Sequence, residues 1–288
     1  MKEKEEKGTH MILKTIVTIL IIAVLILLYA RFIGTRGLNI NEIPIRTDKL
    51  SDNYDGFKII QFSDLHYGST INIDDVTNIV NKINSEKPDV VVFTGDLIEH
   101  DITVNDDNLN NLFTELNKID PSIEVLAVPG NHDYDQETYW DKAMQNLNWT
   151  FLINSYKYVY VDNNNPIVFV GLDDYWHGSP NYDDAFAYYN DVTKDYYTIV
   201  LLHEPDQVDE IKDKHFDIAL AGHSHLGQVR LPFIGAIYTP YGAKKYYNSH
   251  YKLDNNADLY ISGGIGTSTM KLRYFDRPSI NLYRFYTK

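Results

Sequence analysis

The stretch FKIIQFSDLHYG, residues 57–68, decides the fold class because it joins an apolar run to a polar segment. Its first six residues are mostly aromatic and β-branched, which predicts a strand. Asp64 and His66 follow this strand directly. The same arrangement, a short apolar strand and then a polar segment, recurs further along the chain.

The first half of the chain alternates strands with helices. Apolar residues recur at helical spacing over 73–84 and 109–116, and short apolar runs at 90–93 and 125–128 indicate buried strands. This β-α-β-α-β order predicts parallel strands joined by right-handed crossovers. In such sheets, functional side chains gather in the loops beyond the carboxyl ends of the strands.

The second half of the chain is richer in strands. Residues 156–162 and 167–172 flank the turn NNNP and predict a hairpin. Further strands are expected at 198–202, 217–221, 259–262 and 280–284. A β-rich half after an α/β half predicts an α/β fold of two packed sheets covered by helices, a four-layer α/β/β/α sandwich.

Composition narrows the classes of function. The 288 residues are 44% hydrophobic and 23% charged, which is a globular composition. The formal net charge of -14 disfavours nucleic-acid binding, because an acidic surface repels a polyanion. The absence of cysteine excludes disulfides, thiolate zinc sites, iron–sulfur clusters and cysteine nucleophiles.

An apolar segment near the N-terminus predicts a transmembrane anchor. Residues 15–30 (TIVTILIIAVLILLYA) carry no charge, and the long side chains of Lys14 and Arg31 flank them. The apolar run over 11–34 is long enough to span a bilayer. The alternative, a cleaved signal peptide, is disfavoured because no small-x-small cleavage site follows the run.

We expect three regions in the chain: an N-terminal tail and anchor at 1–34, a polar linker at 35–55 and a globular domain at 56–288. Lysine and arginine are nearly balanced on the two sides of the anchor. Our preferred topology is a single-pass protein of the cell membrane with an extracytoplasmic domain.

Five expected strands each end in a polar segment: SDLHYG, TGDLIE, PGNHDY, HEPD and GHSHLGQ. Their candidate functional residues are Asp64, His66, Asp96, Glu99, Asn131, His132, Asp133, His203, His223 and His225. Helix caps or turns would explain any one segment, but not five at equivalent positions. The histidines outside these segments are expected to be surface or packing residues: His10, His100, His177, His215 and His250.

These residue types suit hydrolysis with two metal ions. Imidazole and carboxylate groups are ligands for Mn, Fe and Zn. A carboxylate that bridges two cations about 3.5–4 Å apart creates a clamp for a phosphoryl group. Two divalent cations outweigh the charges of Asp64 and Asp96, so the site would attract an anionic phosphate.

The ordered series DxH, GD, GNHD, H and GHxH, between Asp64 and His225, resembles the calcineurin-like metallophosphoesterase superfamily. The stretches GQVRLPFIGAIYTP (227–240) and ISGGIGTS (261–268) resemble a membrane-anchored bacterial branch. That branch includes cell-envelope phosphodiesterases and enzymes that cleave the pyrophosphate of a UDP-diacylglucosamine lipid precursor. The resemblance implies the metallo-dependent phosphatase fold, a catalytic domain at 56–288 and two divalent ions, Mn, Zn or Fe.

The resemblance also implies a role for each candidate residue. One metal would be held by Asp64, His66, Asp96 and His225. The other would be held by Asp96, Asn131, His203 and His223, so that Asp96 bridges. His132 would protonate or stabilise the leaving oxygen, and Glu99 would orient it from a position where the family usually has aspartate. Leu226 is a further departure, because glycine is frequent there in this branch.

In GHSHLGQ, residues 222–228, an extended backbone would point His223 and His225 to the same side and Ser224 away. Gly222 and Gly227 would give the backbone room for a close approach. We therefore expect the two histidines to serve different metals.

The expected activity is hydrolysis of phosphodiester or pyrophosphate bonds in a cell-envelope or lipid-linked substrate, by a monomer. The alternatives are a phosphomonoesterase or phosphoprotein phosphatase, and a metal-stabilised envelope protein without catalysis. Arg230 is a candidate for contact with a substrate phosphate, although a salt bridge on a strand would also explain it. Lys244, Lys245 and Arg273 could act likewise. Aromatic residues over 175–197 form either a rim for a lipid tail or an ordinary surface excursion.

Overall fold

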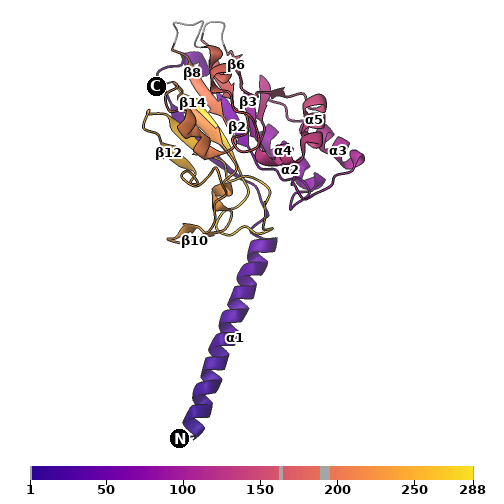
Figure 1. Ribbon diagram of the computed structural model, residues 1–288, viewed down its shortest axis with the longest axis vertical. Coiled ribbons are helices and arrows are strands. Elements are labelled where there is room, and N and C mark those ends of the chain that lie inside the picture. The colour runs from indigo at the N-terminus through magenta and orange to yellow at the C-terminus, as the bar shows by residue number, and fades with distance from the viewer. Residues whose placement is uncertain (1, 162–164, 189–194, 288) are drawn as a thin grey trace.

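The computed structural model describes residues 2–161, 165–188 and 195–287 (Figure 1). After the N-terminal helix α1 (Lys2–Phe32) the chain forms two six-stranded sheets. The first sheet has the order β1 (Asn39–Arg46), β14 (Ser279–Tyr286), β2 (Lys58–Phe62), β3 (Val90–Thr94), β4 (Glu124–Val128) and β5 (Thr150–Phe151). The second has the order β12 (His250–Lys252), β13 (Asp258–Ile261), β9 (Ile218–Ala221), β8 (Tyr197–Leu201), β7 (Ile167–Gly171) and β6 (Ser155–Val159).

The remaining elements are helices and one small ribbon. The α-helices of the domain are α2 (Ile73–Ser85), α3 (Asp106–Leu116), α4 (Asn131–Asp135), α5 (Glu137–Asn146) and α6 (Tyr182–Ala185). The 3-10 helices are η1 (Asp52–Tyr54), η3 (Pro205–Ile211) and η4 (His225–Gly227). The ribbon pairs β10 (Arg230–Leu231) with β11 (Gly235–Ala236).

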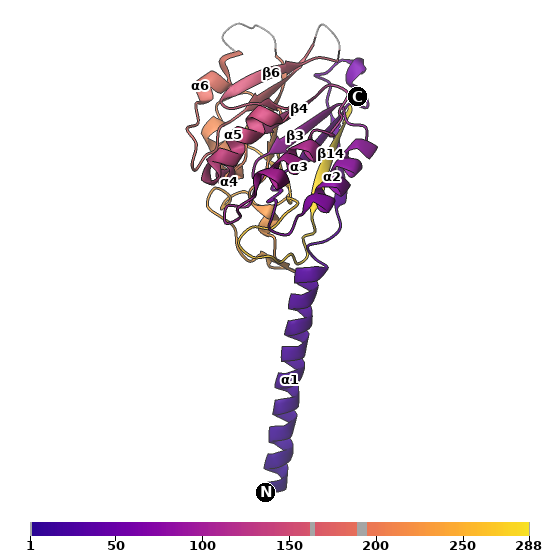
Figure 2. The same cartoon turned by 90° about the vertical axis from the view of Figure 1, so that its right-hand side faces the viewer.

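The two sheets pack face to face, with helices on their outer faces. Figure 2 looks onto α2, α3 and α5, which cover the first sheet. In β3 every residue is buried, and alternate residues face different layers. Val90 and Val92 join the core between the sheets, whereas Val91 and Phe93 face the helices. Strands buried on both faces read as continuous apolar runs, as this one does. The predicted α/β/β/α sandwich is therefore confirmed.

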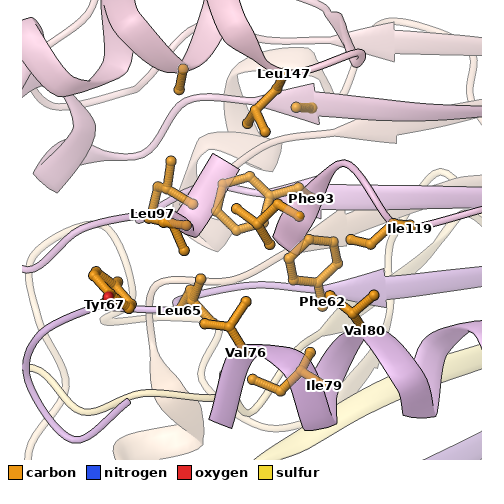
Figure 3. Close-up of a cluster of buried hydrophobic side chains, with 14 of the residues drawn as sticks. Phe62, Leu65, Tyr67, Val76, Ile79, Val80, Phe93, Leu97, Ile119 and Leu147 are labelled. Atoms are coloured by element: carbon orange, nitrogen blue, oxygen red, sulfur yellow. The ribbon is translucent and has the colours of Figure 1, made fainter. Parts of the chain in front are cut away.

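Helices α2 and α3 cover the outer face of the first sheet. An Asn72–Asp75 capping box begins α2, and its apolar face carries Val76, Ile79 and Val80 toward the sheet (Figure 3). Burying each such side chain contributes about 1.5–3 kcal/mol. This packing fixes the strands whose ends carry the polar segments.

The predicted strands are found, and most pair in parallel. The pairs β2–β3, β3–β4, β7–β8, β8–β9 and β13–β9 are parallel. Strands β6 and β7 pair antiparallel, as the predicted hairpin requires. Half of the NNNP turn that we expected between them, residues 163 and 164, lies outside the described residues.

The prediction of a polar linker at 35–55 was wrong for its central part. Residues Asn39–Arg46 form β1, which pairs in parallel with β14 over eight residues. Tyr54 is fully buried. An edge strand is half exposed and tolerates Pro44, so its sequence resembles that of a connector.

Helix α1 extends away from the domain (Figures 1 and 2). Its segment Lys7–Phe32 is long and apolar enough to cross a membrane. Near its C-terminal end α1 contacts the domain, where the Arg273 N–H donates to the Ala30 carbonyl at 3.0 Å. A Cβ at Gly34 would collide with the Arg273 carbonyl, so the chain requires glycine there. Helix α1 is thus joined directly to the loop that contains Arg273.

Candidate metal centre

The five polar segments meet at one edge of the packed sheets. They follow the carboxyl ends of β2, β3, β4, β8 and β9. Three groups of buried ligand atoms converge there, each with its atoms within 4.8 Å of one another, and the third consists of His66, Glu99 and His132. We call Asp64, His66 and His225 the His66 cluster, and Asp96, His203 and His223 the His203 cluster.

In the His66 cluster the ligand atoms face one another closely. The Nε2 atoms of His66 and His225 lie 3.1 Å apart. His225 Nε2 is 3.4 Å from Asp64 Oδ1. His66 Nε2 is 3.5 Å from Asp96 Oδ2, the atom that this cluster shares with the other.

In the His203 cluster the histidines are held by backbone carbonyls. His203 Nδ1 lies 2.6 Å from the Thr94 oxygen, and His223 Nε2 lies 2.6 Å from the Tyr241 oxygen. A carbonyl accepts only, so these nitrogens carry the protons and the opposite nitrogens present lone pairs. Those lone pairs belong to His203 Nε2, 3.2 Å from Asp96 Oδ2, and His223 Nδ1, 3.2 Å from His203 Nε2.

Two buried oxygens show that the donor set fits cations. Asp64 Oδ2 and Asn131 Oδ1 are buried without a hydrogen-bond partner among the described residues. Leaving such groups unsatisfied costs about 1–3 kcal/mol each. Imidazole nitrogens with carboxylate and amide oxygens suit Mn, Fe or Zn. The residues therefore fit two divalent cations with Asp96 between them.

The backbone at the ligands is strained. Positive φ angles occur at Asp64 (52°), His66 (43°), Asp96 (64°), His223 (63°) and His225 (46°). Residues with a Cβ seldom adopt this left-handed conformation, which costs about 1–3 kcal/mol and concentrates at functional sites.

The prediction of an extended GHSHLGQ segment was therefore wrong, because left-handed residues and η4 occupy it. Both histidines still reach inward. A Cβ at Gly222 would collide with Ser63 Oγ, so the expected close approach at that glycine is real.

Buried charges shape the protonation of the site. Burial alone would raise the pKa of Asp96, but the charges of His203 and His132 hold it well below its usual range. Burial opposes the charged form of His203, and the adjacent Asp96 nevertheless raises its pKa well above the usual value. Burial and the charge of His203 lower the pKa of His223 to about 3. Asp96 thus stabilises positive charge at His203 Nε2, whether that charge comes from a proton or from a divalent cation.

Asp133 holds the loops together rather than facing the cations. Its carboxylate accepts the backbone N–H groups of Asp96, Leu97 and Gly130, each at 2.9 Å. Burial and the nearby charge of Asp96 raise the pKa of Asp133 to about 7.

Glu99 lies closer to His66 than to His132. Glu99 Oε2 is 3.1 Å from His66 Nδ1, whereas Glu99 Oε1 is 3.6 Å from His132 Nδ1. A carboxylate in this place fixes the orientation of a ligand histidine. The expectation that Glu99 mainly orients His132 needs this correction.

His100 is a neighbour of the site that the sequence missed. Its Nδ1 lies 3.0 Å from His132 Nδ1, and its backbone N–H donates to the same atom at 3.3 Å. His132 Nδ1 therefore accepts, and His132 Nε2 carries the proton. The position of His100 directly after Glu99 was the available signal. His177, also expected to be a surface residue, lines the pocket described below.

The expected phosphate-binding cations lie elsewhere. Arg273 is fully buried and donates to His225 Nδ1 at 3.0 Å and to Asp276 at 2.9 Å, so no substrate reaches it. Arg230 donates to Asn248 Oδ1 at 2.9 Å and to the Leu226 carbonyl, and it does not line the pocket. Lys245 pairs with Asp209 at 2.7 Å.

A pocket of about 620 Å³ opens above the two clusters. Its polar residues include Asp96, Asn131, His132, His223 and His225. Its apolar wall includes Trp176, Val229, Ile237, Tyr238, Pro240 and Met270. Within the aromatic segment 175–197, Trp176 lines the pocket, whereas Phe186 and Tyr188 are buried and residues 189–194 lie outside the described part. The pocket thus combines a metal-binding floor with an apolar wall.

A phosphoesterase fold with a candidate site for divalent cations is the class that this architecture defines. The family model for calcineurin-like phosphoesterases matches residues 57–227. The chain belongs to this family and is a metal-dependent phosphoric ester hydrolase.

Among its relatives, the uncharacterized metallophosphoesterase YkuE of Bacillus subtilis is 30% identical over 88% of each chain. The phosphodiesterase YaeI of Escherichia coli is 26% identical over 80% of this chain and 83% of its own. A transmembrane protein with metallophosphoesterase domain from Danio rerio is 24% identical over 93% of this chain and 61% of its own.

Proposed function

We propose that this protein is a membrane-anchored phosphodiesterase or pyrophosphohydrolase that cleaves a lipid-linked substrate with two divalent cations. The observation that carries the proposal is the pocket, in which an apolar wall rises directly from a floor of metal-binding residues. A substrate with a phosphate beside an apolar chain matches both surfaces. The YaeI relative is named as a phosphodiesterase, which agrees with the reaction class.

Each residue has a role in this proposal. The His66 cluster would hold one cation, and the His203 cluster with Asn131 would hold the other. When bound, two such cations neutralise phosphoryl charge and make water more acidic. His132 Nε2, which carries a proton, lies 3.5 Å from Ser268 Oγ. From there it can donate a hydrogen bond to the leaving oxygen.

The proposed topology places the domain outside the cytoplasm on a single-pass anchor, acting as a monomer. Because β1 belongs to the first sheet, we place the start of the catalytic domain at residue 39. Helix α1 and the short segment after it then form the anchor region.

The test uses the full chain in detergent with Mn²⁺, bis-p-nitrophenyl phosphate and p-nitrophenyl phosphate. We expect chelator-sensitive hydrolysis that favours the diester. Asp96→Asn should abolish it, whereas the matched control Asp107→Asn, on the exposed start of α3, should not. Faster turnover of the monoester would favour the phosphatase alternative, and bound metal without turnover would favour the non-catalytic one. UDP-diacylglucosamine against UDP-N-acetylglucosamine tests the requirement for acyl chains.

A further inference from the structure

The end of the domain that adjoins α1 exposes large apolar side chains. Phe233 and Ile234, 109% and 73% exposed, form the tip of the β10–β11 ribbon. Phe275 is 65% exposed on the loop at 273–277. In Figure 1 the ribbon lies at the foot of the domain, level with the C-terminal end of α1. We call Phe233, Ile234 and Phe275 the apolar foot.

The backbone of the foot has an unusual conformation. Phe233 and Phe275 have positive φ angles of 66° and 55°, which bulky residues seldom adopt. Strain of this kind persists where it serves a function. Here it leaves the Phe233 ring in solvent and places the largely exposed Phe275 ring edge to face with Tyr274, 4.6 Å between ring centres. Clustered apolar residues exposed in this way mark interaction surfaces.

The α1 residues that share a cavity with Phe275 indicate how deep the foot would lie in a membrane. Phe275 lines a cavity together with Leu25 and Ile26 of α1, and both helix residues belong to the uncharged run 15–30. Ile26 lies six residues before the end of α1 at Phe32, about 9 Å along the helix axis. If α1 spans a bilayer, Phe275 therefore lies at the depth of its interfacial region.

Aromatic and basic residues beside Phe275 fit the same depth. Tyr29 and Tyr274 pack edge to face with ring centres 6.1 Å apart. The guanidinium of Arg277 donates to Tyr29 Oη at 3.4 Å. Tyrosine and arginine side chains of this kind are typical of the headgroup region.

The apolar foot also continues into the pocket. Ile237 and Tyr238, directly after the ribbon, are exposed and line the pocket above the metal clusters. Met270, close in sequence to the 273–277 loop, does the same. An apolar surface thus runs from the level of the membrane to the metal-binding floor.

We propose that the β10–β11 ribbon and the loop at 273–277 insert into the bilayer surface beside α1, so that the pocket opens onto the lipid headgroups. The occupant of the foot is lipid. A substrate held in the membrane would reach the metals without leaving the bilayer surface, and this last step rests on the proposed function.

The absence of cysteine from the chain allows a direct test of insertion. Phe233→Cys and Phe275→Cys, each labelled with an environment-sensitive fluorophore, are reconstituted as full chains in vesicles of phosphatidylcholine and phosphatidylglycerol. Tyr160→Cys is the matched control, because Tyr160 is also exposed and follows β6 at the far end of the domain (Figure 1). We expect lipids spin-labelled near the headgroup to quench the first two labels several-fold more than the control, and aqueous iodide to do the reverse.

If spin-labelled lipids or iodide quenched the labels at positions 233 and 160 equally, the proposal would be overturned. A protein partner would then be the better candidate to cover the apolar foot. The measurement does not depend on turnover, so it separates failure of insertion from failure of the proposed function.

A second variant tests the consequence for activity. Phe233→Ser with Ile234→Ser in the full chain in vesicles should lower turnover of UDP-diacylglucosamine several-fold and leave bis-p-nitrophenyl phosphate hydrolysis unchanged. Equal loss on both substrates would contradict the path from bilayer to metals.

Discussion

The two metal clusters hold their histidines by different means. In the His203 cluster, the carbonyls of Thr94 and Tyr241 fix His203 and His223. In the His66 cluster, charged side chains do so: Glu99 contacts His66, and Arg273 donates to His225. Backbone support depends on the fold alone, whereas side-chain support is lost with a single substitution.

The difference extends to the proton positions. Both histidines of the His203 cluster already direct lone pairs toward Asp96. In the His66 cluster, the guanidinium of Arg273 donates to His225 Nδ1, which places the proton of neutral His225 on Nε2, the atom that faces His66. That proton must leave, and the arginine contact must adjust, before His225 Nε2 can bind a cation. We therefore expect the His203 cluster to bind its ion more tightly.

The largest effect is expected where the clusters meet. Asp96→Asn removes the carboxylate shared by both, so both ions should be lost and diester turnover should fall on the order of 10³-fold or more. Elemental analysis of the purified protein and diester hydrolysis measure these two outcomes. Retention of both ions with near-normal turnover would show that Asp96 does not bridge.

Substituting one histidine of each cluster at a time tests whether the His203 cluster binds its ion more tightly than the His66 cluster. His223→Ala should deplete the ion of the His203 cluster, and His225→Ala the ion of the His66 cluster. Removal of the ion that remains in His225→Ala should require a higher chelator concentration than removal of the ion that remains in His223→Ala. Equal loss of both ions from either variant would contradict separate sites.

Removing the two kinds of support should have unequal effects. Glu99→Gln should weaken binding of one ion by about 10–100-fold, because it removes a charged partner of His66. Tyr241→Ala should leave metal affinity within about threefold, because His223 uses the backbone carbonyl, which alanine retains. Titration with Mn²⁺ measures the metal affinity of both variants. If Tyr241→Ala lost more affinity than Glu99→Gln, the backbone support of His223 and the side-chain support of His66 would both be wrongly assigned.

The smallest effect is expected at His100. His100→Ala keeps the backbone N–H that donates to His132 Nδ1 and removes only a side chain that is 37% exposed. Interactions with exposed groups contribute about 1 kcal/mol or less, so diester turnover should change less than about fivefold. A loss as large as that of His132→Ala would show that the imidazole of His100 takes part directly.

The sequence predicted the strands that carry the site because parallel strands buried on both faces leave unmistakable apolar runs, as VVVF does. Topology then brings their carboxyl ends together, so Asp64 and His225 could be grouped although 161 positions separate them. The sequence failed at β1, where an exposed edge strand has the composition of a connector.

The interactions around the ligands could not be predicted. Glu99 can turn toward either His66 or His132, because its carboxylate oxygens lie at similar distances from both, 3.1 Å and 3.6 Å. Which histidine it contacts depends on the direction of its side chain. Arg273 contacts His225 because the irregular segment between β13 and β14 returns to the site. The residues of this segment carry no periodic pattern from which the contact could be predicted. The left-handed backbone conformation of the ligand residues likewise depends on local geometry rather than on residue type.

A protease that cut the chain between α1 and β1 would release a domain with all its ligands, yet not an equivalent enzyme. The cut removes Ala30, whose carbonyl accepts the N–H of Arg273. The side chain of Arg273 donates to His225 Nδ1, so the cut would remove a backbone contact of a residue that touches a candidate metal ligand. The hydrogen bond at Ala30 thus couples the N-terminal helix to the surroundings of His225.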